Sequence, residues 1–283
     1  TWQDPALTKA LSAYQPSPLK RWQLSLPNRP KLQLAGAAMA CSSVLVMLLY
    51  MGNGSLFSSP APYELKTAQA NSMQQALDDA GYHTVNVDYP SRDYSVEALA
   101  PMAITPALAQ CRAEQSSTIH FVTHSMGGIL LRQYLQHNVI TDLGRVVMMG
   151  PPNQGSQVVD NLKNVPGFEA LNGPAGMQLG TGEQDIPKQL GPVSFELGVI
   201  AGTSSINLIL SNFLPNPDDG KVSVENTKVQ GMCALVTVAV SHPFLMQRQQ
   251  VIDQVLHFLR RGSFLGDNAQ QFSCPAQLKP KLS

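Results

Sequence analysis

The chain has 283 residues, of which 43% are hydrophobic and 13% are charged, enough for one large hydrophobic core with an appended segment. Its 19 basic residues balance 19 acidic ones, and the basic side chains are scattered rather than gathered in a stripe. This pattern lacks the electrostatic footprint of a nucleic-acid-binding protein, so we expect no nucleic acid among the partners.

Residues 1–64 are predicted to form an N-terminal extension. Its segment 34–51, LAGAAMACSSVLVMLLYM, has eighteen residues without a charge and follows several basic side chains. A run of that length just suffices to cross a bilayer as a helix, which would make it a signal-anchor and the protein membrane-associated. The alternative is a first buried strand, VLVMLLY. The sequence leaves both open, and with them a membrane-anchored or a cytoplasmic location.

Residues 65–265 are predicted to form an α/β domain, and 266–283 a C-terminal tail. Segments that are apolar throughout alternate with segments of helical periodicity, which is typical of a mostly parallel sheet with helices on both faces. The helix over 95–112 is expected to break at Pro101 and Pro106. The other predicted helices cover 71–81, 127–137 and 251–259, and the predicted strands cover 84–90, 119–122, 144–152, 195–202 and 234–242.

Residues 161–193 are rich in glycine and proline and lie beyond the C-terminal end of a predicted strand. Since excursions in this position cover the ligand sites of parallel sheets, we expect a lid here. Its apolar residues would line or cover an acyl pocket, unless they serve only in ordinary packing; they are Phe168, Leu171, Met177 and Leu179.

The segment IHFVTHSMGGILLRQYL, residues 119–135, changes from strand to helix at Ser125. A serine on so sharp a turn has a strained backbone and needs small neighbours, which Gly127 provides, although Thr123 stands where the G-x-S-x-G pattern has its first glycine. The turn exposes the hydroxyl and aims the N–H of Met126 at the place where a tetrahedral oxyanion forms. We predict Ser125 as nucleophile and Met126 as oxyanion-hole donor; the alternative is that Ser125 only caps the helix.

A serine nucleophile also needs an acid and a histidine, which follow it in that order in sheets of this kind. Among six histidines, only His242 stands at the C-terminal end of the last predicted strand, where sites of parallel sheets assemble. His124 neighbours the serine but is expected to point to the opposite side of the turn. Asp219 precedes Gly220 in a turn 23 residues before His242, and the adjacent Asp218 is the second candidate.

Taken together, these segments resemble α/β hydrolases of the bacterial lipase and esterase kind over residues 72–264. The pieces TVNVDYPSR, FVTHSMGG, RVVMMGPPNQGS, DDGKVSV and VSHPF stand in the order expected of that family. The resemblance implies an α/β-hydrolase fold, a triad of Ser125, His242 and Asp219, and acyl transfer through an acyl-enzyme without a cofactor. It favours Asp219 over Asp218, because the acid of such a D-G-x-V turn precedes the glycine.

The first 70 residues do not match this family. Its members have a strand ending in His-Gly, whose loop supplies the second oxyanion N–H, and no His-Gly pair stands before Ser72. Either VLVMLLY is that strand, with MGNGS as its loop, or the N-terminal segment is unrelated and the sheet lacks a central strand. A missing oxyanion donor would cost about 10²–10³ in rate.

Three functions are consistent with the sequence. The first is a serine hydrolase of carboxylic esters, lipids included; the second is an acyltransferase that uses the same triad; the third is an inactive hydrolase-like domain that binds a partner or lipid. No metal site is expected, because Asp142, Asp218 and Asp219 are too few and too isolated for calcium.

The four cysteines are Cys41, Cys111, Cys233 and Cys274, and none forms a C-x-x-C pair. This spacing favours buried or free thiols over zinc or redox chemistry and leaves a single bridge, such as Cys111–Cys274, open.

Overall fold

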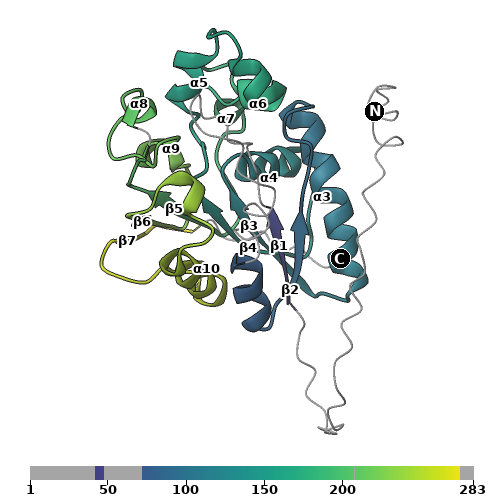
Figure 1. Ribbon diagram of the computed structural model, residues 1–283. Helices are drawn as coiled ribbons and strands as arrows, with labels where there is room; N and C mark the ends of the chain where they lie inside the picture. The colour runs from purple at the N-terminus through teal and green to yellow at the C-terminus, as the bar shows by residue number, and fades with distance from the viewer. Residues whose placement is uncertain (1–41, 48–71, 207, 275–283) are drawn as a thin grey trace, which may run out of the picture. The chain divides into compact units, whose positions relative to one another are not determined.

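The computed structural model describes residues 42–47, 72–206 and 208–274 (Figure 1). Most of the predicted N-terminal extension, the MGNGS loop and the end of the C-terminal tail therefore lie outside the described residues.

The described strands form one seven-stranded sheet with the order β2-β1-β3-β4-β5-β6-β7. All neighbouring strands are parallel except β6 and β7, which are antiparallel. This arrangement, with helices on both faces, confirms the predicted α/β fold class. The strands are β1 (Ser42–Met47), β2 (His83–Val87), β3 (Thr118–His124), β4 (Leu143–Met149), β5 (Leu197–Gly202), β6 (Ala234–Val238) and β7 (Ala269–Gln271).

Strand β1 lies within the apolar segment 34–51, for which the sequence left a membrane helix or a strand open. It pairs in parallel with β2 on one side and with β3 on the other, so it occupies an interior position of the sheet (Figure 1). Met47 is in register with Thr123, two residues before Ser125. The sheet therefore contains a strand, β1, next to β3, the strand that leads to Ser125. Among the described residues, no helix is both long and apolar enough to cross a membrane.

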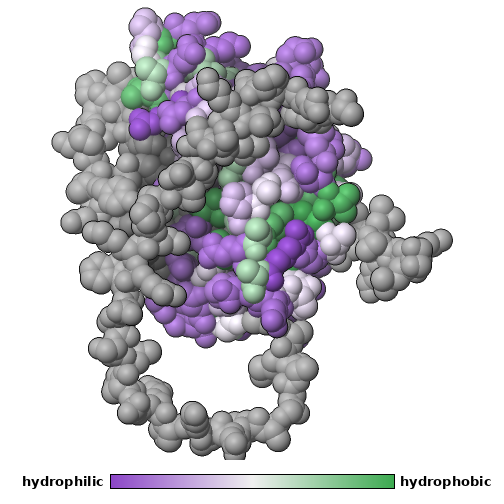
Figure 2. All heavy atoms as spheres, turned by 90° about the vertical axis from the view of Figure 1, so that its right-hand side faces the viewer, coloured by the Kyte–Doolittle hydropathy of each residue, from purple (hydrophilic) through white to green (hydrophobic). Residues whose placement is uncertain are grey.

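The sheet separates two layers of hydrophobic core. Phe121 and Val146 face the layer that contains α3 and α4, whereas the alternate residues Val122 and Val147 face the layer of α10 and the helix over 72–79. On the side of α3, hydrophilic surface is interrupted by a band of hydrophobic residues (Figure 2). The helices are α3 (Val96–Ala113), α4 (Met126–His137), α5 (Gln157–Leu162), α6 (Phe168–Met177), α7 (Ile186–Gln189), α8 (Leu208–Ser211), α9 (Val224–Thr227), the 3₁₀ helix η1 (His242–Phe244) and α10 (Gln249–Arg261).

Helix α3 corrects one prediction, because it continues through Pro101 and Pro106 instead of breaking there. Each proline removes one backbone N–H from the helix. The loss is offset by burial of the face that α3 presents to the sheet and to α4, which includes Leu99 and Ile104. Tertiary packing here overrides a local preference against helix.

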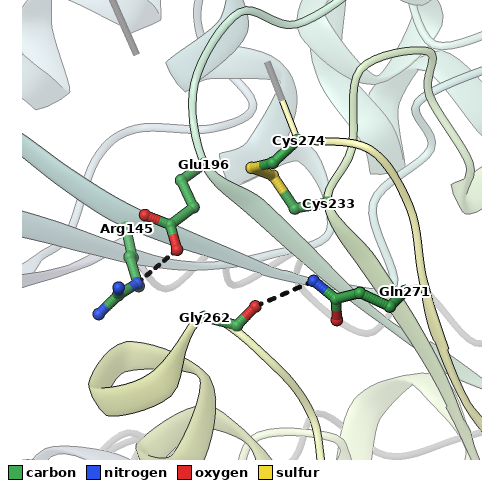
Figure 3. Close-up of a disulfide and its surroundings, with 6 residues drawn as sticks. All are labelled: Arg145, Glu196, Cys233, Gly262, Gln271 and Cys274. Carbon is green, nitrogen blue, oxygen red and sulfur yellow. Dashed lines mark hydrogen bonds and ion pairs between the residues drawn. A yellow bond between two sulfur atoms is a disulfide. The ribbon is translucent and has the colours of Figure 1, made fainter. Parts of the chain in front are cut away.

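A disulfide joins Cys233, which precedes β6, to Cys274, which follows β7 (Figure 3). The sequence favoured thiols and left a single bridge such as Cys111–Cys274 open. The structure has a bridge of Cys274 with Cys233 instead, and Cys111 is the buried thiol in α3 that the sequence favoured. Antiparallel pairing of β6 with β7 aligns the two cysteines, and the N–H of Phe272 donates to the carbonyl of Cys233 at 2.8 Å. The bridge thus fastens the last described strand to the sheet.

Candidate active site

Ser125 lies between the end of β3 and the start of α4, with φ 55° and ψ −127°. This φ is in the left-handed region, which a non-glycine residue adopts only when its surroundings enforce it. The serine N–H donates to the carbonyl of Met149 at the end of β4 (2.9 Å), which fixes the turn against the sheet. The side chain forms no cap hydrogen bond to α4, so its hydroxyl has another partner.

That partner is His242, the first residue of η1. Its Nε2 lies 2.9 Å from Oγ of Ser125, and its Nδ1 lies 2.7 Å from Oδ2 of Asp219. All three side chains are buried. A carboxylate oxygen accepts hydrogen bonds, so in this arrangement Nδ1 donates to Asp219, which leaves Nε2 to accept from the serine hydroxyl. The structure therefore brings together the three residues that the sequence singled out.

The two adjacent aspartates of the acid turn have different partners. Asp219 Oδ1 accepts from the N–H groups of Lys221 (3.0 Å) and Val222 (2.9 Å), which leaves Oδ2 to face His242. Asp218 instead accepts from the Gly220 N–H (2.7 Å) and, through Oδ2, from the Ser211 hydroxyl (2.6 Å). Of the two candidates, only Asp219 contacts the imidazole; Asp218 ties α8 to the turn.

Two glycines at strand ends make room for the acid, and sequence reasoning missed both. A Cβ atom on Gly150, which follows β4, would lie 3.0 Å from both Oδ2 of Asp219 and Nδ1 of His242. A Cβ atom on Gly202, the last residue of β5, would lie 2.7 Å from Cβ of Asp219 and would collide with the carbonyl oxygen of Val240. The only sequence signal was that each glycine ends an apolar strand.

His124 was expected to point away from the site, and that expectation is wrong. Its ring centroid lies 4.7 Å from that of His242, and its Nε2 lies 3.0 Å from the His242 carbonyl oxygen. The cause is the alternation of side chains along β3. His124 faces the same side as Val122, toward the layer that also contains Leu245 next to η1.

The predicted oxyanion donor, Met126, is the first residue of α4. N–H groups in the first turn of a helix have no acceptor within the helix and carry the positive end of its dipole. One of the two alternatives left open by the sequence took the second donor from MGNGS, which lies outside the described residues.

The predicted lid, residues 161–193, contains α6 and α7, which lie together with α5 at the top of Figure 1. Within it Leu179 is buried, whereas Leu171 is exposed. Arg132 of α4 fixes one end of the segment, because its guanidinium donates to the carbonyl of Gly191 (2.7 Å). The same guanidinium donates to the carbonyl of Asn153 in the loop after β4 (3.0 Å). Burial lowers the pKa of Arg132 to about 10.

In the part of the chain that the structure describes, no group of three or more histidine, cysteine or acidic residues is arranged to hold a metal ion. The polar atoms of the site are those of a hydroxyl, an imidazole and a carboxylate in a chain of hydrogen bonds. Such a chain can move a proton from the hydroxyl to the imidazole.

No protein-family model and no curated protein matches this sequence. Solved structures do match. Lipase BlEst2 from Bacillus licheniformis in its mature form gives a TM-score of 0.57 at 18% identity, covering 79% of this chain and 92% of the lipase. The propeptide form of the same lipase gives a TM-score of 0.58 at 19% identity, covering 83% of this chain and 53% of the lipase. Phospholipase PlaB from Legionella pneumophila gives a TM-score of 0.55 at 15% identity, covering 72% of this chain and 53% of the phospholipase. At these identities the similarity concerns the fold.

Proposed function

We propose that this chain, which has the α/β-hydrolase fold, is a serine hydrolase that cleaves carboxylic esters through an acyl-enzyme. The observation that carries the proposal is the pair of hydrogen bonds from His242 to Ser125 and to Asp219. The strained backbone of Ser125 supports it, because such strain persists where function requires it. The lipase and phospholipase named above support it at the level of fold.

In the proposed reaction, Oγ of Ser125 attacks the ester carbonyl while Nε2 of His242 takes the hydroxyl proton. Asp219 stabilises the imidazolium, and the N–H of Met126 donates to the oxyanion. The intermediate collapses, the C–O bond to the alcohol breaks, and His242 gives its proton to the leaving oxygen. Water then attacks the acyl-enzyme by the same route in reverse, which releases the carboxylic acid and restores the serine.

The surroundings of the site support an apolar ester as substrate. Residues 203–217, which include α8, carry no charged side chain. Ile206 is 70% exposed and Ile209 is 66% exposed, so apolar groups face outward next to the acid turn. Ser211 links this segment to Asp218. An exposed apolar surface next to the acid turn suits acyl chains or a lipid surface better than a polar substrate.

The test is hydrolysis of p-nitrophenyl esters of increasing acyl length by the wild type and by Ser125→Ala. We expect the variant to lose a factor of about 10³ or more in kcat, because the nucleophile is removed. Ser263→Ala, a serine after α10, serves as the matched control and should retain activity. A folded wild type that hydrolyses no ester, or a Ser125→Ala variant as active as wild type, would refute the proposal. Adding an alcohol or an amine acceptor and identifying the product separates hydrolysis from acyl transfer.

A further inference from the structure

We propose that His124 is a positioning residue that holds the general base His242 in place, above all after Ser125 has been acylated. This inference rests on the proposed serine-hydrolase function and deepens it. It assigns a role to a second histidine that neither attacks the substrate nor receives the proton from Ser125.

The first argument is how His242 is anchored. Its backbone N–H donates to the carbonyl of Asp219 at 2.9 Å, and its carbonyl accepts from Nε2 of His124 at 3.0 Å. The backbone N–H of Leu245 also donates to that carbonyl, at the longer distance of 3.4 Å. Because η1 is a single 3₁₀ turn, it has little internal hydrogen bonding of its own. His124 thus fixes one of the two ends of the His242 residue.

The second argument is what His124 is attached to. It is the last residue of β3, a strand paired on both sides, and it directly precedes Ser125 in the chain. Its ring also lies 4.7 Å from the ring of His242, centroid to centroid. One buried side chain therefore connects the turn that carries the nucleophile to the loop that carries the base. Their separation is set even without the hydrogen bond between Ser125 and His242.

The third argument concerns the reaction itself. When Oγ of Ser125 forms the ester bond of the acyl-enzyme, it has given its proton to His242 and can no longer donate to Nε2. One of the two side-chain anchors of His242 is then lost, although the imidazole must still activate water. The bond from His124 to the His242 carbonyl involves no reacting atom and persists. Loss of this bond should slow deacylation more than acylation.

His120 offers a matched control on the same strand. It is also a buried histidine in β3, but its Nδ1 accepts from the backbone N–H of Arg145 at 2.8 Å, away from the site. Replacing His120 removes a buried imidazole without touching His242.

The experiment compares His124→Phe, His124→Ala and His124→Gln with the wild type and with His120→Asn, using p-nitrophenyl acetate in stopped flow. Phenylalanine and alanine lack the donor, whereas the glutamine amide nitrogen can replace Nε2. We expect phenylalanine and alanine to lower steady-state kcat about 10- to 100-fold with a smaller effect on the acylation burst. We expect KM to fall in step with kcat as the acyl-enzyme accumulates, and we expect His124→Gln and His120→Asn to retain most of the activity.

The outcomes are distinguishable. If the wild type neither acylates nor turns over, the proposed function fails. If the wild type is active and folded His124→Ala or His124→Phe keeps its kcat, the positioning role is wrong although the hydrolase remains. It is equally wrong if acylation and deacylation fall together and glutamine gives no rescue, since His124 would then serve only packing. Should the phenylalanine variant not fold, the alanine and glutamine variants decide.

Discussion

Gly150 lies against the imidazole of His242 so closely that a Cβ atom on the glycine would be 3.0 Å from Nδ1. The same atom would be 3.0 Å from the Asp219 oxygen that Nδ1 contacts. The end of β4 therefore forms one wall of the Asp219–His242 pair. The absence of a side chain there is a requirement of the candidate site.

Gly150→Ala is the first test of this relationship. Its φ of 55° costs an alanine about 1–2 kcal/mol of stability, and the new methyl group pushes the imidazole away from the carboxylate. We expect kcat to fall about 10- to 100-fold in ester hydrolysis. Gly81→Ala is the matched control, because Gly81 also has positive φ (90°) but nothing lies within 4 Å of its Cβ position. It should lose stability alone, and equal kcat in both variants would contradict the account.

The acid turn gives a second prediction. Asp219→Asn should lower kcat by about 10⁴, because an amide nitrogen facing Nδ1 favours the wrong imidazole tautomer and cannot stabilise the imidazolium. Asp218→Asn should lower kcat far less, since Asp218 contacts Ser211 and Gly220 instead of His242. The measurement is kcat for both variants on one p-nitrophenyl ester. A larger loss in Asp218→Asn would reverse the assignment of the acid.

The disulfide gives a third prediction, on stability. The two cysteines are 41 residues apart, so chain-entropy considerations give the bridge about 4 kcal/mol, and 2–4 kcal/mol is the typical measured range. We expect Cys274→Ser to lower the free energy of urea unfolding by about that amount and to leave kcat at room temperature unchanged. An unchanged midpoint, or equal sensitivity of wild type and variant to a reductant, would show that the bridge contributes nothing.

The pH dependence of stability gives a fourth prediction. Burial lowers the pKa of His120, and the charge of Arg145 adds to the effect. Below the ordinary histidine pKa of about 6.5, the unfolded state therefore binds more protons than the folded state. The contribution of His120 to stability is present above that pH and is lost as the pH falls toward its folded-state pKa.

The check compares urea unfolding of the wild type and His120→Asn at about pH 8 and about pH 5. Asparagine keeps an acceptor for the N–H of Arg145 but does not titrate. We expect the variant to lose less stability than the wild type on acidification. An equal loss in the two proteins would assign the acid sensitivity to other groups.

Most of what could be predicted from the sequence came from local patterns of apolar and polar residues. Ser125 stands where an apolar strand meets a helix, and His242 follows the last long apolar strand, so chain order alone placed both at one edge of the sheet. The hydrophobic periods likewise predicted the α/β class. Each of these inferences needs only neighbouring residues and the rule that parallel strands end on one side.

The features that could not be predicted from the sequence depend on contacts between segments that are far apart in the chain. An uncharged run of eighteen residues has the same hydropathy whether it becomes a membrane helix or a strand such as β1, and only pairing with β2 and β3 distinguishes the two. The partner of Cys274 depended on β7, which is only three residues long and mostly polar. The contact of Gly150 with His242 depended on close approach in space, which no sequence pattern records.

The central claim is that Ser125 is a nucleophile activated by His242, and covalent labelling with a fluorophosphonate tests it most directly. Such a reagent reacts with a serine whose base and oxyanion donors are both assembled. The wild type should gain one phosphonyl group on the peptide that contains Ser125, as located by mass spectrometry. Ser125→Ala and His242→Ala should gain none. A folded wild type that stays unlabelled, or a Ser125→Ala variant labelled as fast as the wild type, would contradict the account.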